Sequence, residues 1–422
     1  MFLVFLVTSL LLNPSESLPK SGNDTVTPVI LVPGICGSQI DGWYVKDSAP
    51  HYYCTKDSGG WTLLWLCIDC MLPPTISCWT DTFRLDISDV SDIKNRAGVQ
   101  TKVNDFGYTD GIGYLDEHQF VVQFEKLIIG IEKLPGYTRG ISIRGAPYDF
   151  RYTPNTKVGQ EYFIKLRYLV EETYELNGNT PVMLVAHSMG NPYIVNFLTK
   201  QDQAWKDKFI DGYVSLAGVF GGASKAIRSI ISGETEGMPQ IFVDPLTMRE
   251  FERTSPSVFW LMPSPDLFGD TPLLYADGRN YTAHDYHDLL LESKVPKGDE
   301  LYDLVKDLPL FVEDIGVDVH CIHGKDQSTP LHFRYGDDSE FPDTQPITVN
   351  GDGDGTVNLR SLELCKKFKR LKSYKTVTGF LATHLEILQR KDVIQFIGDL
   401  LTKTNSERRG EEDREDDKTL VF

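Results

Sequence analysis

The sequence predicts an α/β protein built around a doubly wound parallel sheet, and three observations lead to this fold class. Short apolar runs at Pro28–Val32, Val182–Ala186 and Tyr213–Ala217 have the composition of strands that are buried on both faces. Segments with apolar residues at helical spacing lie between such runs, for example at residues 159–177. Small residues and glycines follow the strands directly. Strands that alternate with helices in this way indicate a parallel sheet.

The length of 422 residues is consistent with one α/β core that carries inserted segments. We expect this core to span residues 28–404. Residues 223–315 are irregular and rich in Pro, Gly and Asp, so we expect them to form a cap or lid inserted over the sheet. The core pattern then resumes at Val317–Ile322 and Pro346–Val349. Residues 405–422 are polar and charged, which predicts a disordered tail.

Net charge and composition narrow the class of partner. The chain carries 60 acidic and 42 basic residues, a formal net charge of −18, whereas a protein that binds nucleic acid presents a basic surface. We therefore expect no nucleic-acid partner. The hydrophobic fraction of 41% supplies enough apolar material for a sizeable core.

The N-terminus has the pattern of a signal peptide over residues 1–18. The apolar run Phe2–Leu12 is too short to span a membrane, and Pro14 and small residues follow it. The run lacks the usual positive charge at its start, and a buried N-terminal strand or helix is the alternative. We expect a protein of the secretory pathway, lysosomal or extracellular, whose seven cysteines can pair. Asn23 and Asn280 each begin an Asn-x-Thr glycosylation sequon.

The sharpest local pattern is Ala186-His187-Ser188-Met189-Gly190, directly after an apolar strand and before a helical stretch. A nucleophile elbow needs such a strand–turn–helix context, with small residues beside the serine so that strand and helix pack closely. Ser-x-Gly alone is a weak signal, and an ordinary strand-to-helix turn is the alternative. The context favours the elbow, so we expect Ser188 to be a catalytic nucleophile in an α/β-hydrolase fold.

A serine nucleophile needs a base, and in this fold the order along the chain is Ser, then Asp or Glu, then His. His384 is the one histidine of nine that follows the glycine- and aspartate-rich turn at residues 351–355. Asp352 and Asp354 are both candidates for the acid, and Asp354 is preferred. The same turn resembles the start of a calcium-binding loop, but position twelve of that loop is Ser361 instead of Glu. We expect no metal and no cofactor.

The predicted chemistry is that of a serine esterase. Ser188 attacks an ester carbonyl, His384 transfers the proton, and Asp354 orients the imidazole. The tetrahedral oxyanion requires backbone N–H donors. We expect one donor at Met189, directly after the nucleophile, and the other at Ile35, in the loop after the first core strand.

Several longer stretches are distinctive: VILVPGICGSQI at 29–40, HYYC at 51–54, SCWTDTFRL at 77–85, GYTRGISIRGAPYDFR at 136–151, VAHSMGNPY at 185–193, QAWKDKFI at 203–210, VSLAGVFGG at 214–222 and NGDGDGTVNL at 350–359. Together they resemble the family of lysosomal phospholipase A2 and lecithin–cholesterol acyltransferase, with the lysosomal branch closer. The resemblance implies the same triad of Ser188, Asp354 and His384, and disulfides Cys54–Cys78 and Cys321–Cys365. The sequence departs from the lysosomal members at Ile35, where they carry Asp, and Cys36, Cys67 and Cys70 fall outside the pattern.

The resemblance also implies a small disulfide-closed subdomain, residues 40–90, that docks on membranes, and a mobile lid at 223–245. The alternative for the apolar residues of the subdomain is packing inside the cap. The residues expected to dock are Trp61, Leu63, Leu64, Trp65, Leu66, Met71 and Leu72.

The activity that the resemblance implies is acyl transfer from a glycerophospholipid to water or to a lipid alcohol such as ceramide, without calcium. The expected partners are a phospholipid membrane or lipid-particle surface and the acceptor alcohol, and the protein is expected to be a monomer. A plasma-type phosphatidylcholine–sterol acyltransferase or a neutral-lipid lipase is the alternative enzyme. A lipid-binding protein without catalysis is the alternative of a different class.

Overall fold

A computed structural model describes residues 26–235, 243–336 and 340–419, so the predicted signal peptide and Asn23 lie outside the described residues. Its centre is a six-stranded sheet in which every neighbouring pair is parallel. The sheet has the order β15 (Leu371–Val377), β12 (Val319–Gly324), β9 (Ile210–Leu216), β8 (Val182–His187), β1 (Val29–Val32) and β7 (Ile143–Gly145). This is the sheet of the α/β-hydrolase fold, which confirms the predicted fold class.

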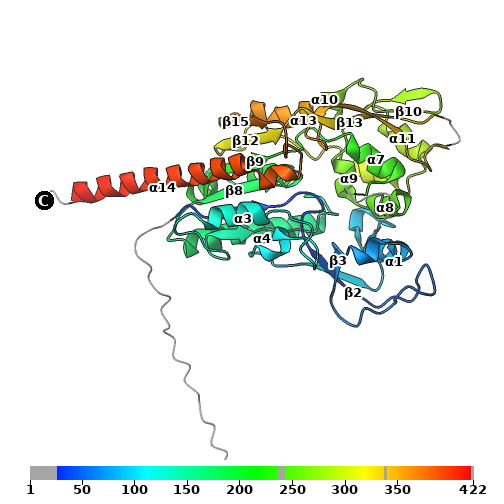
Figure 1. Ribbon diagram of the computed structural model, residues 1–422, viewed down its shortest axis with the longest axis horizontal. Coiled ribbons are helices and arrows are strands. Elements are labelled where there is room, and N and C mark those ends of the chain that lie inside the picture. Colours follow the sequence, from blue (N-terminus) through cyan, green and yellow to red (C-terminus); the bar gives the residue numbers. More distant parts are fainter. Residues whose placement is uncertain (1–25, 236–242, 337–339, 420–422) are drawn as a thin grey trace, which may run out of the picture.

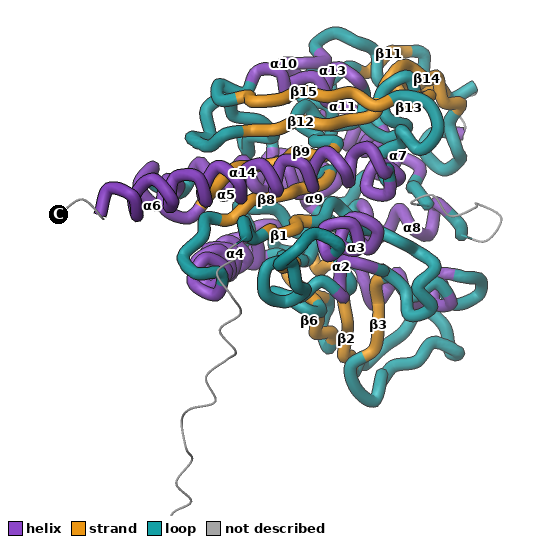
Figure 2. The backbone as a smooth tube through the Cα atoms, turned by 60° about the vertical axis from the view of Figure 1, so that its left-hand side comes forward, coloured by secondary structure: helices purple, strands orange, loops and turns teal. Residues whose placement is uncertain are grey.

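Helices cover both faces of this sheet (Figures 1 and 2). α3 (Glu125–Glu132) and α14 (Lys391–Thr419) pack against each other on one face. α4 (Lys157–Leu176), α5 (Gly190–Thr199) and α6 (Gln203–Phe209) cover the other face, and α5 is almost entirely buried. Because β8 is buried at all six positions, its continuous apolar sequence reflects contact with helices on both sides.

A second, four-stranded sheet lies beside the central one. Its order is β11 (Arg279–Tyr281), β10 (Leu274–Ala276), β13 (Gln327–Arg334) and β14 (Ile347–Gly353). The strand expected at Pro346–Val349 therefore belongs to this sheet and not to the central one. The expected cap, residues 223–315, contributes β10 and β11 to this sheet. Its strand β10 pairs with β13, which comes after the cap in the sequence.

The described part of residues 223–315 is mainly helical and covers the carboxyl ends of the central strands (Figure 1). Part of the expected lid, residues 236–242, lies outside the described residues. The helices of this region are α7 (Lys225–Ser232), α8 (Pro245–Glu252), α9 (Pro256–Trp260), α10 (Pro265–Phe268), α11 (Tyr286–Glu292) and α12 (Gly298–Val305). Near the C-terminus follow α13 (Leu359–Leu362) and the 3₁₀ turns Glu363–Lys367 and Glu386–Gln389.

The expected subdomain at residues 40–90 contains a three-stranded antiparallel sheet and helix α1 (Ile76–Phe83). The sheet order is β3 (Thr62–Trp65), β2 (Ile40–Tyr44) and β6 (Val99–Val103), so this unit extends to Val103, beyond the predicted boundary. Smaller elements beside it are the 3₁₀ turns Asp69–Met71 and Val90–Asp92, the paired strands β4 (Leu85–Asp86) and β5 (Lys94–Asn95), and α2 (Asp110–Gly113).

Three disulfides are present. Cys54–Cys78 closes the subdomain and Cys321–Cys365 ties β12 to the turn before β15, which are the two pairings that the family resemblance implies. Cys67 pairs with Cys70 as well. Cys36 is buried and outside any disulfide.

The C-terminal tail differs from the prediction of disorder at residues 405–422. Helix α14 continues to Thr419, and residues 420–422 lie outside the described residues. Val393, Ile397 and Leu401 are buried and hold the first half of this helix on the core. Glu, Lys and Arg favour helix, so the charged sequence can prolong a helix that packing has already nucleated. Within the described ranges, no helix is both long and apolar enough to cross a membrane.

Candidate active site

Ser188 occupies a sharp turn between β8 and α5. Its φ of +53° is unusual for a residue with a side chain, and such strain is typical of a nucleophile elbow. The Ser188 amide donates to the carbonyl of Leu216 on the neighbouring strand at 3.0 Å, and the Ser188 carbonyl accepts from the Asn191 amide at 3.0 Å. These bonds fix the strained turn on both sides.

Close approach of two backbone turns explains the glycines of this region. A Cβ atom on Gly190 would lie 2.4 Å from the carbonyl oxygen of Pro33, and one on Gly34 would lie 2.6 Å from Ser188 Cβ. The turn after β1 and the elbow after β8 can therefore pack together only without those side chains. This contact brings Ile35 and Met189 to the site of the serine.

The structure brings the three predicted catalytic residues together in one hydrogen-bonded chain. His384 Nε2 lies 2.8 Å from Ser188 Oγ, and His384 Nδ1 lies 2.7 Å from Asp354 Oδ2. All three side chains are buried. A neutral imidazole with its proton on Nδ1 donates to the carboxylate and accepts from the serine hydroxyl, so Nε2 is the basic nitrogen beside Oγ.

Hydrogen bonds to backbone groups fix the positions of Asp354 and His384 relative to each other. Asp354 Oδ1 accepts from the amides of Thr356 and Val357 at 3.1 and 2.7 Å, and the Asp354 carbonyl accepts from the His384 amide at 2.8 Å. Asp352, the other candidate acid, is exposed and accepts from the amide of Asp326 instead. The structure therefore places Asp354 in the chain of hydrogen bonds and Asp352 outside it.

His187 is a residue of this site that the sequence analysis missed. It is buried, and its Nε2–H donates to the carbonyl of His384 at 2.8 Å. Burial, and then repulsion from His384, lower the pKa of His187 to about 3. His187 is therefore neutral and supports the backbone of the base. Its only signal in the sequence was its position beside Ser188.

The predicted oxyanion donors lie at the two packed turns. Met189 directly precedes α5 and is buried, and Ile35 follows the close-packed Gly34 in the turn after β1. Within the described ranges, neither amide donates to a backbone carbonyl. Hydrogen bonds from Tyr148 and Trp65 hold the turn from outside. The Tyr148 hydroxyl donates to Pro33 O at 3.0 Å, the Tyr148 amide donates to Ser38 Oγ at 3.1 Å, and the Trp65 indole donates to Cys36 O at 2.8 Å.

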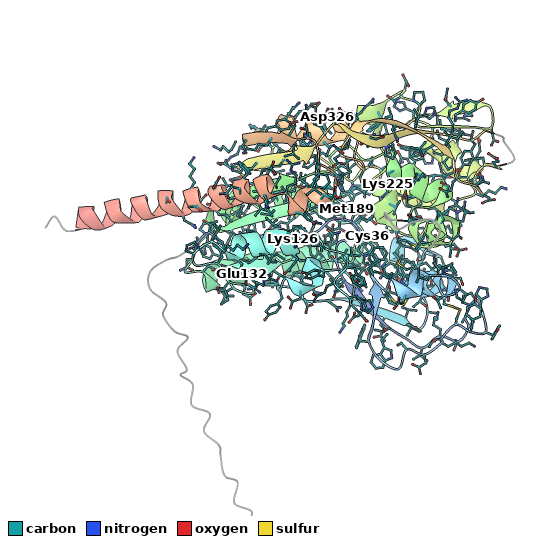
Figure 3. All side chains as sticks on the ribbon, in the orientation of Figure 1. Cys36, Lys126, Glu132, Met189, Lys225 and Asp326 are labelled. Atoms are coloured by element: carbon teal, nitrogen blue, oxygen red, sulfur yellow. A yellow bond between two sulfur atoms is a disulfide. The ribbon has the colours of Figure 1, made fainter. Side chains whose placement is uncertain are left out.

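A cavity of about 540 Å³ opens onto Ser188 and His384. In Figure 3, Cys36, Met189 and Lys225 gather at this place, between the ends of the central strands and α7. Lys225 and Glu252 supply the lysine and carboxylate side chains at its wall. Most of the lining is apolar, as a cavity for a fatty acyl chain requires: Trp65, Leu66, Leu115, Val121, Phe150, Val219, Ala223, Ala226, Phe251, Val258 and Leu261. Across the described ranges, no group of three His, Cys, Asp or Glu side chains has the arrangement of a metal site.

The residues expected to dock on membranes separate into two groups. Leu64, Trp65, Leu66 and Met71 are buried, so the docking prediction is wrong for these four in this conformation. The reason is tertiary packing, because the Trp65 ring stacks on Phe83 and its indole reaches the turn after β1. The alternative of inward packing applies to them.

The exposed part of the predicted set is smaller. The side chain of Trp61 is 41% exposed, and Leu63 and Leu72 are half-buried. The sequence analysis did not single out Trp43, Tyr52 and Tyr53, which are also exposed on this subdomain. The Trp43 and Trp61 rings lie 6.0 Å apart. Asn280, the sequon asparagine within the described residues, is exposed on β11.

Comparison with known proteins shows the family to which this sequence belongs. The lecithin:cholesterol acyltransferase family matches residues 61–288 and 307–391. Lysosomal phospholipase A and acyltransferase of Homo sapiens is 36% identical over 406 residues, covering 94% of each chain. Phosphatidylcholine-sterol acyltransferase of Mus musculus is 32% identical over 364 residues, covering 85% of this chain and 81% of that protein.

A solved structure, the crystal structure of the Tle4–Tli4 complex, contains a chain with a TM-score of 0.56 and 13% identity, which covers 90% of this chain and 98% of that one. That likeness concerns the fold alone. The sequence relatives extend over nearly the whole chain, and the family match includes Ser188, Asp354 and His384. The protein therefore belongs to the lecithin:cholesterol acyltransferase family.

Proposed function

We propose that this protein is a serine-dependent phospholipase A and O-acyltransferase, which moves a fatty acyl chain from a glycerophospholipid to water or to a lipid alcohol. One observation carries the proposal: the hydrogen-bonded chain Ser188–His384–Asp354 opens onto an apolar cavity. The sequence relatives named for phospholipase and acyltransferase activity support the choice of a phospholipid as acyl donor.

The first half-reaction forms an acyl-enzyme. Ser188 Oγ attacks the ester carbonyl carbon, and its proton passes to Nε2 of His384. The ester C–O bond then breaks, and the leaving alcohol of the lysophospholipid takes the proton from Nε2. Asp354 stabilises the imidazolium that forms between these steps. The acyl chain is now an ester of Ser188.

The second half-reaction releases the acyl chain. Water or a lipid alcohol attacks the Ser188 ester and gives its proton to His384, and Oγ regains that proton when the acyl–serine bond breaks. The amides of Ile35 and Met189 stabilise both tetrahedral intermediates, where one such donor contributes typically about 3 kcal/mol. These steps use only groups of the chain and need no calcium.

We further propose that the subdomain docks the enzyme on a phospholipid surface through its exposed aromatic side chains. Trp43 and Trp61 form one aromatic pair, and Tyr52 and Tyr53 form another directly before Cys54, at one end of the Cys54–Cys78 disulfide. Aromatic rings of this kind favour the membrane interface. We expect a monomer that carries sugar at Asn280 and Asn23 and that acts in the lysosome or outside the cell.

Lipid product analysis tests this proposal. The purified protein is incubated with phosphatidylcholine vesicles, with and without short-chain ceramide, at about pH 4.5 and about pH 7.4, beside Ser188→Ala. We expect free fatty acid and acylated ceramide from the wild type and neither product from the variant. A higher yield with sterol as acceptor would assign the plasma-type reaction instead. No product beyond that of Ser188→Ala would reject the phospholipid substrate.

A further inference from the structure

Two of the most exposed apolar side chains in the described part of the molecule stand on loops beside the active-site cavity, outside residues 40–90 of the docking subdomain. Phe120 is 76% exposed and Phe380 is 89% exposed. Single apolar side chains on a surface are common and carry no meaning by themselves. These two differ because each sits on a braced loop next to a residue that lines the cavity.

The first loop presents Phe120. Val121, its neighbour, lines the cavity, and the Leu115 amide donates to the Val121 carbonyl at 3.0 Å to close the loop. The buried carboxylate of Asp116 accepts from the amides of His118, Phe120 and Val121 at 3.1, 3.2 and 2.7 Å. The loop is therefore fixed from inside, with Phe120 held in solvent.

The second loop presents Phe380 and leads to the base. The Arg390 guanidinium donates to the carbonyls of Thr378 and Phe380 at 3.2 and 2.8 Å, and the Asp392 carboxylate holds that guanidinium at 2.6 and 2.8 Å. Leu385, which directly follows His384, lines the cavity and is 47% exposed. This loop too is rigidly braced while its phenylalanine points away from the core.

We propose that Phe120, Phe380 and Leu385, here called the entrance rim, insert into the acyl region of a phospholipid bilayer where the cavity meets the membrane. The inference rests on the proposed function and adds a second lipid contact to the docking subdomain. An acyl chain that leaves a bilayer for this cavity must cross the rim, and an apolar rim keeps that path out of water.

The charge of the molecule favours apolar insertion over electrostatic attachment. A formal net charge of −18 gives no general attraction to anionic lipid, and two carboxylates, the exposed Glu117 and the half-buried Glu386, lie on or next to the two rim loops. The rim should therefore bind zwitterionic phosphatidylcholine, and the binding should depend weakly on salt. Weak dependence on salt distinguishes apolar insertion into a bilayer from the binding of anionic headgroups by a basic patch.

The test uses the full chain with Phe120→Ser and Phe380→Ser combined. The matched control combines Ile164→Ser and Tyr168→Ser on α4, which are 58% and 67% exposed and do not line the cavity. Three quantities are compared: partition onto phosphatidylcholine vesicles by flotation, hydrolysis of those vesicles as a function of lipid concentration, and hydrolysis of a water-soluble short-chain ester.

The rim variant should need about tenfold more lipid for half-maximal binding and hydrolysis, because two apolar insertions are lost. Its rate on the soluble ester should stay at the wild-type level, and the control should match the wild type throughout. Unchanged lipid partition would overturn the proposal. An equal loss on the soluble ester would also overturn it, because the rim would then serve the cavity itself. A change of oligomeric state in lipid-free buffer would assign the rim to a second copy of the chain instead.

Failure of the proposed function gives a different pattern. A wild type that binds vesicles but releases no fatty acid would reject the phospholipase, while a loss of vesicle binding in the rim variant would still support the rim as a lipid contact.

Discussion

Single residues decide how closely the turn after β1 and the elbow after β8 approach each other. Gly34 faces Ser188 with no side chain between them, and Gly190 faces the carbonyl of Pro33 in the same way. The amides of Ile35 and Met189 depend on this contact for their position, because each belongs to one of the two turns. The proposed oxyanion site therefore depends on the two glycines as well as on the two amide donors.

Gly34→Ala should nearly abolish activity while leaving the fold intact. The new Cβ would lie 2.6 Å from Ser188 Cβ, so one turn must shift and an oxyanion donor moves with it. We expect kcat on a soluble ester to fall by about 100-fold or more. Gly398→Ala on α14 is the control, since its new Cβ meets Leu134 at an ordinary 3.7 Å. Equal kcat for both variants would refute the role of the contact.

His187 gives a prediction for stability against pH. Burial, and then repulsion from His384, lower its pKa to about 3, whereas an unfolded histidine titrates near its usual value of about 6.5. At a pH between these two pKa values, residue 187 is protonated in the unfolded chain and neutral in the native chain. The contribution of His187 to the free energy of unfolding is therefore fully present above the pKa of the unfolded state, and it is lost as the pH falls toward 3.

The change His187→Gln removes this titration and keeps an N–H donor for His384 O. The loss of unfolding free energy between pH 7 and pH 4.5 should shrink by roughly 2 kcal/mol relative to the wild type. Urea unfolding at the two pH values measures the difference. Parallel pH profiles for the two proteins would show that His187 is not the group that titrates.

At the scale of elements, strand β3 connects the docking subdomain to the active site. Trp61, directly before the strand, is exposed, while Trp65 at its end is buried, lines the cavity and donates its indole N–H to Cys36 O. Cys36 directly follows Ile35, so one strand joins the proposed lipid surface to the proposed oxyanion turn.

The change Trp65→Phe should lower kcat by about tenfold, because the bond that holds the turn is lost while the ring still packs. Trp79→Phe is a matched control, since the Trp79 indole also donates to a backbone carbonyl, Leu64 O, at 2.8 Å, but does not line the cavity. Both variants should lose similar stability in thermal unfolding. A similar fall of kcat in the two variants would attribute the effect to packing alone.

Some elements could be predicted from the sequence, and others could not. β8 and β9 were readable because strands of a parallel sheet that are buried on both faces contain a mainly apolar run. β13 was not readable, and β14 was expected only at Pro346–Val349 and as part of the core pattern, because a half-exposed strand mixes polar and apolar residues. Their sheet also includes β10, which comes from a distant part of the chain. An apolar composition alone also could not separate Trp61, which faces solvent, from Trp65, which faces the cavity.

The same limit applies to the site. The order Ser, Asp, His along the chain picked out the three side chains that the fold brings together, because this order follows from the topology of the sheet. The supporting hydrogen bond from His187 to His384 O joins residues 197 positions apart, and no pattern of spacing in the sequence predicts it.

At the scale of the whole molecule, disulfides cross-link the chain and close loops of very different length. Cys321–Cys365 spans 44 positions and joins β12 to the turn before β15, whereas Cys67–Cys70 spans only three. A longer closed loop restricts the unfolded chain more strongly. The first disulfide should therefore contribute more to global stability than the second.

Replacing Cys321 and Cys365 with Ser should lower the unfolding free energy by about 3 kcal/mol, and the same change at Cys67 and Cys70 should cost clearly less. Chemical unfolding of the two double variants compares them directly. The reverse order would show that loop length does not govern the contribution of these disulfides.

Covalent labelling, with the labelled residue mapped by mass spectrometry, tests whether Ser188, activated by His384, is the nucleophile of this enzyme. The wild type is treated with a fluorophosphonate and digested, beside Ser188→Ala and His384→Ala. We predict one adduct, on Ser188, absent from the first variant and formed at least about 100-fold more slowly in the second. An adduct on another serine, or phospholipid hydrolysis that persists in Ser188→Ala, would contradict the claim.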